Sequence, residues 1–278
     1  MNEKPKLSAP QLLKLVFKRL RPAIGCAGYV LIAASVAGTY SLPLLLFTLS
    51  FALAYVAGDV YNDYTDYDED VRNERTDKLT VSGVVSPEGM KNISFIVLAV
   101  ALFLVISNPL AFAFNLLAAM VFFAYSDQRI RLKKYTIWGY LAFASIFPFL
   151  PFVVPAALGG SLQFSAAAAV AIFLFGQIAY ILCQKDSTDR KDNTNLFMRH
   201  GHAVGTALCA LFALMSALPL IWLSLGSFPL LLVSGSNLAL KALNVSQIHT
   251  GAVRSMRSRI MLFEHLTPLV FTGVFLWI

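Results

Sequence analysis

The chain has 278 residues, of which 58% are hydrophobic and only 13% charged, and its mean hydropathy is +0.69. A single soluble core of this length does not accommodate so many apolar side chains, so the composition excludes a soluble globular domain and predicts a surface solvated largely by lipid. The net charge of +7 comes from basic residues spread over several segments, which argues against a nucleic-acid-binding domain.

Apolar runs of roughly spanning length, about 17 to 25 residues, recur along the chain. They lie near residues 22–40, 43–62, 92–107, 109–126, 136–157, 164–185, 203–223, 228–246 and 260–278. We therefore predict an all-α polytopic membrane protein with nine transmembrane helices in one domain, 1–278. Because two runs are short or broken by Pro and Gly, eight spans with a re-entrant segment is the alternative. Apolar and basic side chains at helical spacing in residues 8–21 predict an interfacial amphipathic helix.

The charges predict the orientation of these helices. All 22 Lys and Arg residues lie before the first run or beside the ends of the second, fourth, sixth and eighth runs, with Lys241 counted at the eighth. The connections near 107–109, 158–163 and 223–227 carry no charge. The positive-inside rule then places the N-terminus and the charged connections in the cytoplasm. We expect an integral protein of the inner (plasma) membrane.

Most acidic residues gather at the end of the second run, between Asp59 and Glu88. In a helix, Asn62, Asp66 and Asp70 are four residues apart and share one face. Carboxylates at that spacing repel one another unless cations bridge them, and Mg²⁺ is commonly held by carboxylates, waters and phosphate oxygens. The alternative is a solvated acidic helix end, but charge at membrane depth costs roughly 2.5 to 3.5 kcal/mol per residue and usually marks function.

A second acidic cluster, Asp186, Asp189 and Asp192, ends the sixth run. The same number of positions separates Asp63 from Asp186 and Asp66 from Asp189. This spacing indicates a weak internal repeat with a site between the two halves, near one membrane face. Cations flank both clusters, so the favoured ligand is a diphosphate.

The first cluster matches the pattern N-D-x-x-D-x-x-x-D without substitution, as Asn62, Asp63, Asp66 and Asp70. With this motif the chain resembles the UbiA superfamily of intramembrane prenyltransferases, and the segment from Tyr125 to Lys133 is similar to the loop that follows the family's fourth helix.

Two segments depart from the family's pattern. The run from Thr76 to Ser86 is similar to the loop after the first motif, with Lys78 and Leu79 in place of the usual Arg-Pro pair. The second motif is D-x-x-D-x-x-D here, whereas the family commonly has D-x-x-D-x-x-x-D, so either Asp192 or Asn193 completes it.

The resemblance implies nine helices around a central cavity, capped by the loops 71–91 and 186–202, with two Mg²⁺ ions and an isoprenyl diphosphate. The residues it implies as metal ligands are Asn62, Asp63, Asp66, Asp70, Asp186, Asp189 and Asp192. The implied diphosphate contacts are Arg72, Lys78, Arg129, Lys133 and Lys185, each of which is otherwise a plain membrane-proximal anchor. The catalytic candidates are Asp66, Asp189 and Tyr125, the last because an aromatic face stabilises a cation.

The function these features favour is transfer of a prenyl group to a lipophilic acceptor, such as an aromatic quinone precursor or a prenylglycerol phosphate, within the lipid bilayer. A terpene cyclase, which needs no acceptor, is an alternative that the altered second motif supports. A polyprenyl phosphate glycosyl-type transferase is another. A cation-coupled transporter would place its acids near the bilayer midplane, whereas here they gather at one rim.

Overall fold

The computed structural model describes residues 9–75, 78–187, 195–250, 266–275 and 277, and every regular element in them is helical. The elements are α1 (Ala9–Ala37), α2 (Leu42–Thr65), α3 (Tyr67–Arg72), α4 (Pro87–Phe103), α5 (Pro109–Ser126), η1 (Leu132–Tyr135), α6 (Ile137–Ala144), η2 (Phe147–Phe149), α7 (Leu150–Leu158), α8 (Phe164–Asp186), α9 (Leu196–His200), α10 (His202–Leu223), α11 (Phe228–Thr250) and a helix at Leu266–Phe275.

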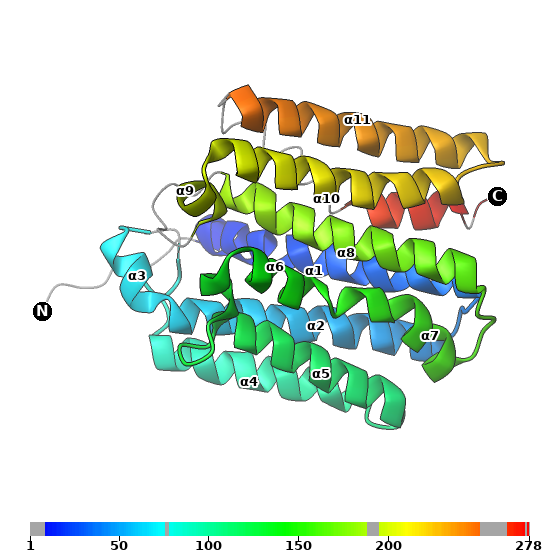
Figure 1. Ribbon diagram of the computed structural model, residues 1–278. Coiled ribbons are helices and arrows are strands. Elements are labelled where there is room, and N and C mark those ends of the chain that lie inside the picture. Colours follow the sequence, from blue (N-terminus) through cyan, green and yellow to red (C-terminus); the bar gives the residue numbers. More distant parts are fainter. Residues whose placement is uncertain (1–8, 76–77, 188–194, 251–265, 276, 278) are drawn as a thin grey trace, which may run out of the picture.

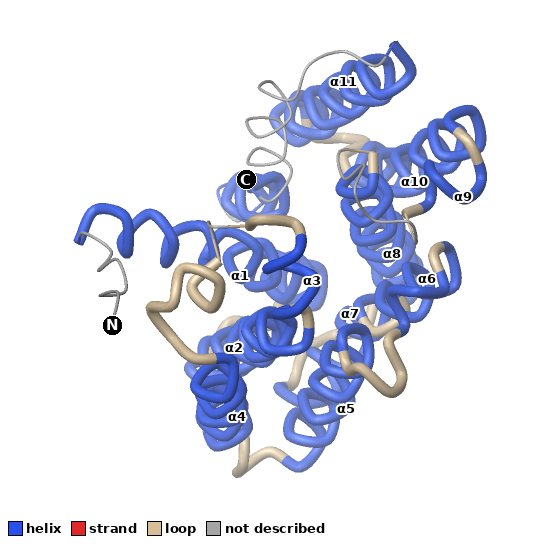
Figure 2. Tube along the Cα trace, turned by 90° about the vertical axis from the view of Figure 1, so that its left-hand side faces the viewer, coloured by secondary structure: helices blue, strands red, loops and turns tan. Residues whose placement is uncertain are grey.

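The long helices run side by side in one bundle, and Figure 2 shows them nearly end-on. Helices α3 and α9 and the α5–α6 connection lie at one end of the bundle, whereas the α4–α5, α7–α8 and α10–α11 connections lie at the other (Figure 1). The charged connections that the structure describes therefore share one end and the uncharged connections share the opposite end, as the charge pattern predicted. Which end faces the cytoplasm stays a prediction.

Seven helical segments of the described residues are long and apolar enough to cross a membrane. They are Leu20–Ala37, Leu42–Thr65, Pro109–Ser126, Ile137–Leu158, Phe164–Asp186, His202–Leu223 and Phe228–Thr250. The third expected run corresponds to the 17-residue α4, and the last contains the shorter helix Leu266–Phe275. The all-α membrane fold is confirmed, and the count of nine spans stays a prediction.

The segments predicted as an interfacial helix and a first span are joined in α1, which contains Pro22. Proline lacks the amide donor that continues a helix and commonly bends it. Figure 2 shows the first turns of α1 leading away from the bundle. The predicted cap loops contain short helical pieces, since Arg72 ends α3 and α9 lies within 186–202. Their role as caps stays a prediction.

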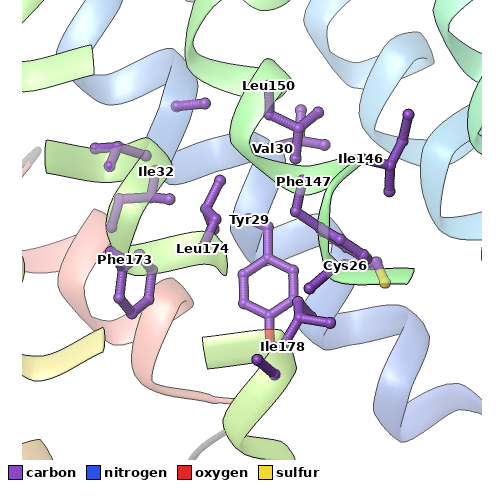
Figure 3. Close-up of a cluster of buried hydrophobic side chains, with 14 of the residues drawn as sticks. Cys26, Tyr29, Val30, Ile32, Ile146, Phe147, Leu150, Phe173, Leu174 and Ile178 are labelled. Carbon is purple, nitrogen blue, oxygen red and sulfur yellow. The ribbon is translucent and has the colours of Figure 1, made fainter. Parts of the chain in front are cut away.

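Close helix contacts hold the bundle together. A Cβ atom at Gly58 of α2 would lie 2.7 Å from the Cβ of Phe122 on α5, and one at Gly176 of α8 would lie 2.7 Å from the main-chain nitrogen of Ser216 on α10. Small residues at such crossings let membrane helices approach closely. In the middle of the bundle, Tyr29 of α1 packs edge-on against Phe147, with ring centroids 5.7 Å apart (Figure 3).

The charge tally was wrong for Lys241. This residue is fully buried in α11, where its Nζ donates to Gln177 Oε1 at 2.8 Å and lies 4.6 Å from the ring centroid of Tyr180, both on α8. Asn244 donates to the Tyr180 hydroxyl at 2.7 Å. Amide and phenol groups on α8 offset the cost of desolvating the lysine, so it is buried between helices and is not a solvent-exposed anchor. A count of charges along the chain does not detect such partners.

Candidate active site at the charged end of the bundle

The first acidic motif lies where α2 ends and α3 begins. Asn62 and Asp63 belong to the last turn of α2, Asp66 is the single residue between the two helices, and Asp70 lies in α3. The main-chain nitrogen of Asp66 donates to Asn62 O at 2.9 Å, and that of Asp70 donates to Asp66 O at 2.8 Å. These two bonds keep the four-residue spacing, but the main-chain nitrogens of 67–69 do not continue the hydrogen-bond ladder of α2. The single continuous helix that the sequence predicted is therefore interrupted at Asp66.

Lys78, from the connection after α3, contacts two carboxylates of this motif. Its Nζ lies 2.6 Å from Asp63 Oδ1 and 3.8 Å from Asp70 Oδ2. Arg75 adds a longer contact of 3.4 Å to Asp70 Oδ1. Asp63 and Asp70 are both buried, so these ion pairs form away from bulk water. The predicted diphosphate contact Lys78 therefore lies on the motif itself.

Asp66 is surrounded by cations from the α5–α6 connection. The Lys133 ammonium contacts both of its carboxylate oxygens and lies 3.2 Å from Asn62 Oδ1. Arg131 Nη2 pairs with Glu69 and lies 3.7 Å from Asp66 Oδ1. Lys133 is thus the second predicted diphosphate contact that meets the motif.

Burial shifts the protonation equilibria of this cluster. It raises the pKa of the Asp70 carboxyl, although Lys78 and Arg75 oppose the shift. It lowers the pKa of the Lys133 ammonium, against the stabilising charge of Asp66. Both shifts have the same physical cause, because a poorly solvated charge is costly unless an opposite charge compensates it.

Local backbone geometry sets the position of Lys133. The 3-10 turn η1 is flanked by Arg131 at φ 43° and Thr136 at φ 45°, a left-handed region that is unusual for residues other than glycine and costly for a β-branched one. Gly139 of α6 packs directly on this turn, since a Cβ there would lie 2.2 Å from Leu132 O. The absence of a side chain at Gly139 therefore allows η1 to lie against α6.

The second acidic motif begins at Asp186, the last residue of α8. Its Oδ2 accepts hydrogen bonds from the Tyr140 hydroxyl of α6 and, at 2.8 Å, from the main-chain nitrogen of Leu196 in α9. Asn195 Nδ2 donates to Asp186 O. Asp186 is therefore held in place by two neighbouring helices.

The other members of the second motif, Asp189 and Asp192, lie outside the described residues, as does Asn193. Their predicted roles, and which of the last two completes the motif, stay predictions. Within the described part of the chain, no three His, Cys, Asp or Glu side chains are grouped closely enough to hold a metal ion.

Residues 132–140 touch both acidic motifs. Near the start of this segment Lys133 contacts Asp66, and at its end Tyr140 contacts Asp186. The two helix ends predicted to face a common site are therefore linked by one segment, η1 and the beginning of α6.

The remaining predicted residues differ in exposure and packing. Arg72 and Arg129 are exposed, and their side chains form no ion pair within the residues that the structure describes. Lys185 is exposed in the last turn of α8. Tyr125 is partly buried in α5 and packs edge-on against Phe143, with centroids 4.7 Å apart. The predicted roles of these residues stay predictions.

Sequence reasoning assigned no role to Arg131 or Tyr140. Arg131 lies in the loop already singled out, where its proximity to Lys133 was the available signal. Tyr140 lies in an apolar run, where a tyrosine is unremarkable, and only the packing of α6 against α8 brings it to Asp186.

Fold and site together define a polytopic α-helical membrane protein with carboxylates and cations clustered at one end of its bundle. A model of the UbiA prenyltransferase family matches residues 23–265, and the chain belongs to that family. The family resemblance drawn from the first motif is thereby confirmed.

Curated relatives are named protoheme IX farnesyltransferase. The protein from Cronobacter sakazakii is 33% identical over 133 residues, which cover 46% of this chain and 42% of that protein. The protein from Salmonella typhimurium is 28% identical over 171 residues, covering 60% of this chain and 55% of that protein. The chain thus spans about half the length of the curated relatives it matches.

Solved structures show the same fold. A UbiA homolog from Archaeoglobus fulgidus, bound to GPP and Mg²⁺, aligns with a TM-score of 0.67 at 14% identity, covering 94% of this chain and 98% of that one. A digeranylgeranylglyceryl phosphate synthase aligns with a TM-score of 0.62 at 15% identity, covering 96% and 98%.

Proposed function

We propose that the chain is an intramembrane prenyltransferase that moves a prenyl group from an isoprenyl diphosphate to a lipophilic acceptor, with Mg²⁺ as cofactor. The observation that carries the proposal is the contact of Lys78 and Lys133 with the carboxylates of the first motif. Cations and carboxylates intermixed in this way provide partners for both a diphosphate and its metal ions. The GPP and Mg²⁺ bound to the similar archaeal protein support the same chemistry.

The donor types of the first motif suit Mg²⁺, although no three acidic, His or Cys side chains among the described residues are grouped closely enough to hold an ion as they stand. The motif supplies hard oxygen donors, an amide and three carboxylates, of the kind that Mg²⁺ prefers. Asp70 Oδ2 is buried and accepts no hydrogen bond from any described residue. We assign Asn62, Asp63, Asp66, Asp70 and Asp186 as ligands, with Asp189 and Asp192 completing a two-ion site. When bound, the metal would neutralise charge on the departing diphosphate.

The chain's own cations would stabilise the same charge. Lys78, Lys133 and Arg131 are already gathered at the motif, so they can donate to diphosphate oxygens as the allylic C–O bond breaks. Arg72, Arg129 and Lys185 are the outer cations of the proposed site.

Tyr125 is the proposed aromatic contact for the developing allylic cation. It directly precedes Ser126, whose hydroxyl donates to Asn62 Oδ1 at 2.7 Å, so its ring belongs to the helix that borders the motif. An aromatic face stabilises a nearby cation electrostatically.

The acceptor is proposed to be an aromatic quinone precursor or a prenylglycerol phosphate. A prenylglycerol phosphate is consistent with the name of the second similar structure. We place the protein in the inner membrane with its N-terminus and active site on the cytoplasmic side, because the charged connections share that end of the bundle.

The test is incubation of purified protein in detergent with Mg²⁺ and radiolabelled prenyl diphosphates, with and without candidate acceptors. A labelled conjugate that forms only with an acceptor supports the proposal. A hydrocarbon or terpene alcohol formed without acceptor would identify a cyclase instead. Absence of turnover with every prenyl diphosphate tested would refute the proposal, leaving the glycosyl-type transferase and the transporter to be tested with sugar donors and ion flux.

A further inference from the structure

Asp59 is the acidic residue of α2 to which the proposed function gives no role. It lies three residues before Asn62, so the two side chains leave the helix on the same side. With a rise of about 1.5 Å per residue, Asp59 lies roughly 4.5 Å further from the charged end of the bundle than Asn62. An ionisable side chain inside a spanning helix is costly and usually marks function.

The interactions of Tyr55 show which way this part of α2 faces. Helix α2 packs against both α1 and α5 (Figure 2). Tyr55 lies one turn before Asp59 and interacts electrostatically with it, with Tyr29 of α1 and with Tyr125 of α5. Asp59 therefore lies on the side of α2 that faces the interior between α1 and α5, where it is only partly buried.

The same interior region contains the proposed contact for the allylic cation. The rings of Tyr55 and Tyr125 both pack edge-on against Phe143, with centroid distances of 6.4 Å and 4.7 Å. Tyr125 was assigned to the cation, and Tyr55 joins that aromatic group to Asp59. A carboxylate and a cation-stabilising aromatic group therefore line the same part of the bundle, one turn below the first acidic motif.

We propose that Asp59 is the general base of the transfer and takes a proton from a hydroxyl group of the acceptor. The allylic C–O bond of the donor breaks, and its electron pair leaves with the diphosphate. An oxygen or a ring carbon of the acceptor forms the new bond to the allylic carbon, and the hydroxyl proton passes to the Asp59 carboxylate. When a ring carbon of a phenol reacts, the hydrogen on that carbon then moves to the phenol oxygen.

This inference rests on the proposed function and adds the residue that activates the acceptor, together with the hydroxyl group that the acceptor must carry. The carboxylates assigned to Mg²⁺ are less suited to this step, because metal coordination engages the lone pairs that would take the proton. Asp59 lies one turn away from them, toward the interior in which a lipophilic acceptor would approach. Aspartate is among the side chains that serve as general bases.

The test uses Asp59→Asn, which keeps the shape of the side chain and an oxygen that accepts a hydrogen bond but does not take up the proton. The purified full-length chain in detergent is incubated with Mg²⁺ and labelled geranyl diphosphate, either without acceptor, with 4-hydroxybenzoate as a phenol or with geranylgeranylglyceryl phosphate as an alcohol. We expect kcat for transfer to fall about a hundredfold or more, as is typical for loss of a general base. The KM for the acceptor should change little.

Steps that precede proton transfer should be unaffected by Asp59→Asn. These are binding of the unreactive donor analogue geranyl thiolodiphosphate, measured by calorimetry, and release of diphosphate in the absence of acceptor. Asp68→Asn, at an exposed position of α3, removes the same charge and should behave as the unmodified protein does. Asp59→Glu keeps a carboxylate and should retain more transfer than Asp59→Asn, and equal loss in both would indicate a packing role and overturn the inference.

The other outcomes separate this inference from the proposed function. If Asp59→Asn transfers as fast as Asp68→Asn, the inference is wrong while the proposed function stands. The inference is also wrong if diphosphate release and analogue binding fall together with transfer, because Asp59 then belongs to the donor site. If the unmodified protein consumes the donor but labels neither acceptor, no hydroxyl group has lost a proton and the inference fails. If the donor is not consumed at all, the proposed function itself fails.

Discussion

The hydroxyl of Tyr140 on α6 donates a hydrogen bond to Asp186 Oδ2 at the end of α8. This contact orients the first carboxylate of the second motif, which makes Tyr140 a positioning residue. Tyr140→Phe removes the donor while keeping the ring. We expect turnover to fall about tenfold to a hundredfold, since one hydrogen bond to a charged group is worth about 1.5 to 3 kcal/mol.

The matched control is Tyr135→Phe, because Tyr135 is exposed in η1. Prenyl transfer measured over a Mg²⁺ titration separates the roles. A positioning effect raises the Mg²⁺ concentration needed for half-maximal rate. If Tyr140→Phe instead lowers both the unfolding temperature and the rate but leaves that Mg²⁺ concentration unchanged, the contact is structural only.

Asp66 is approached by two cations of the α5–α6 connection, Lys133 and Arg131. Asp66→Ala should lower turnover at least about a hundredfold, as expected for loss of a group that stabilises charge in the transition state. Asp68→Ala, an exposed position in α3, should retain full activity. Comparable losses in both variants, measured as product formed per folded protein, would contradict the assignment of Asp66.

Gly139 permits the close contact between α6 and η1. Gly139→Ala forces a Cβ against Leu132 O and should displace the turn that carries Lys133, at a cost of about 1 to 3 kcal/mol for overpacking. We expect weaker binding of geranyl thiolodiphosphate, an unreactive analogue of the prenyl donor, measured by isothermal titration calorimetry. Gly235→Ala in α11 is the control, because a Cβ there meets no atom within 4 Å; equal binding by both variants would argue against the packing role.

Lys241 is the buried cation between α11 and α8. Lys241→Met keeps an unbranched side chain of similar shape without the ammonium group and leaves Gln177 Oε1 without its lysine donor, so the protein should lose about 1 to 3 kcal/mol of stability. Thermal unfolding in detergent measures the loss. Lys91→Met removes a partly exposed lysine that pairs with Glu88 and lies 5.1 Å from the Tyr64 ring centroid. Each of these contacts is worth about 1 kcal/mol or less, so this variant should lower the unfolding temperature much less.

Much of the site could be predicted from the sequence because the residues of each acidic motif lie close together in the chain. The motif was found from its spacing, although the single helix expected for Asn62, Asp66 and Asp70 is divided into α2 and α3 at Asp66. Hydropathy likewise identifies the spanning segments, because membrane helices satisfy their own backbone hydrogen bonds.

The rest depends on packing between distant segments. Tyr140 reaches Asp186 only because α6 lies against α8, and Lys241 is buried only because α8 offers Gln177 and Tyr180. No regular spacing of residues in the sequence predicts either contact. The sequence also predicted separate segments at 8–21 and near 22–40. The structure joins them in the single helix α1, which contains Pro22.

Residues 132–140 connect to one acidic helix end through Lys133 and to the other through Tyr140. The separation of the two acidic ends therefore depends on the length of this stretch as well as on the transmembrane helices. Lengthening or shortening it would change the width of the site without replacing a single carboxylate, which makes this stretch the natural place to alter which headgroups the protein admits.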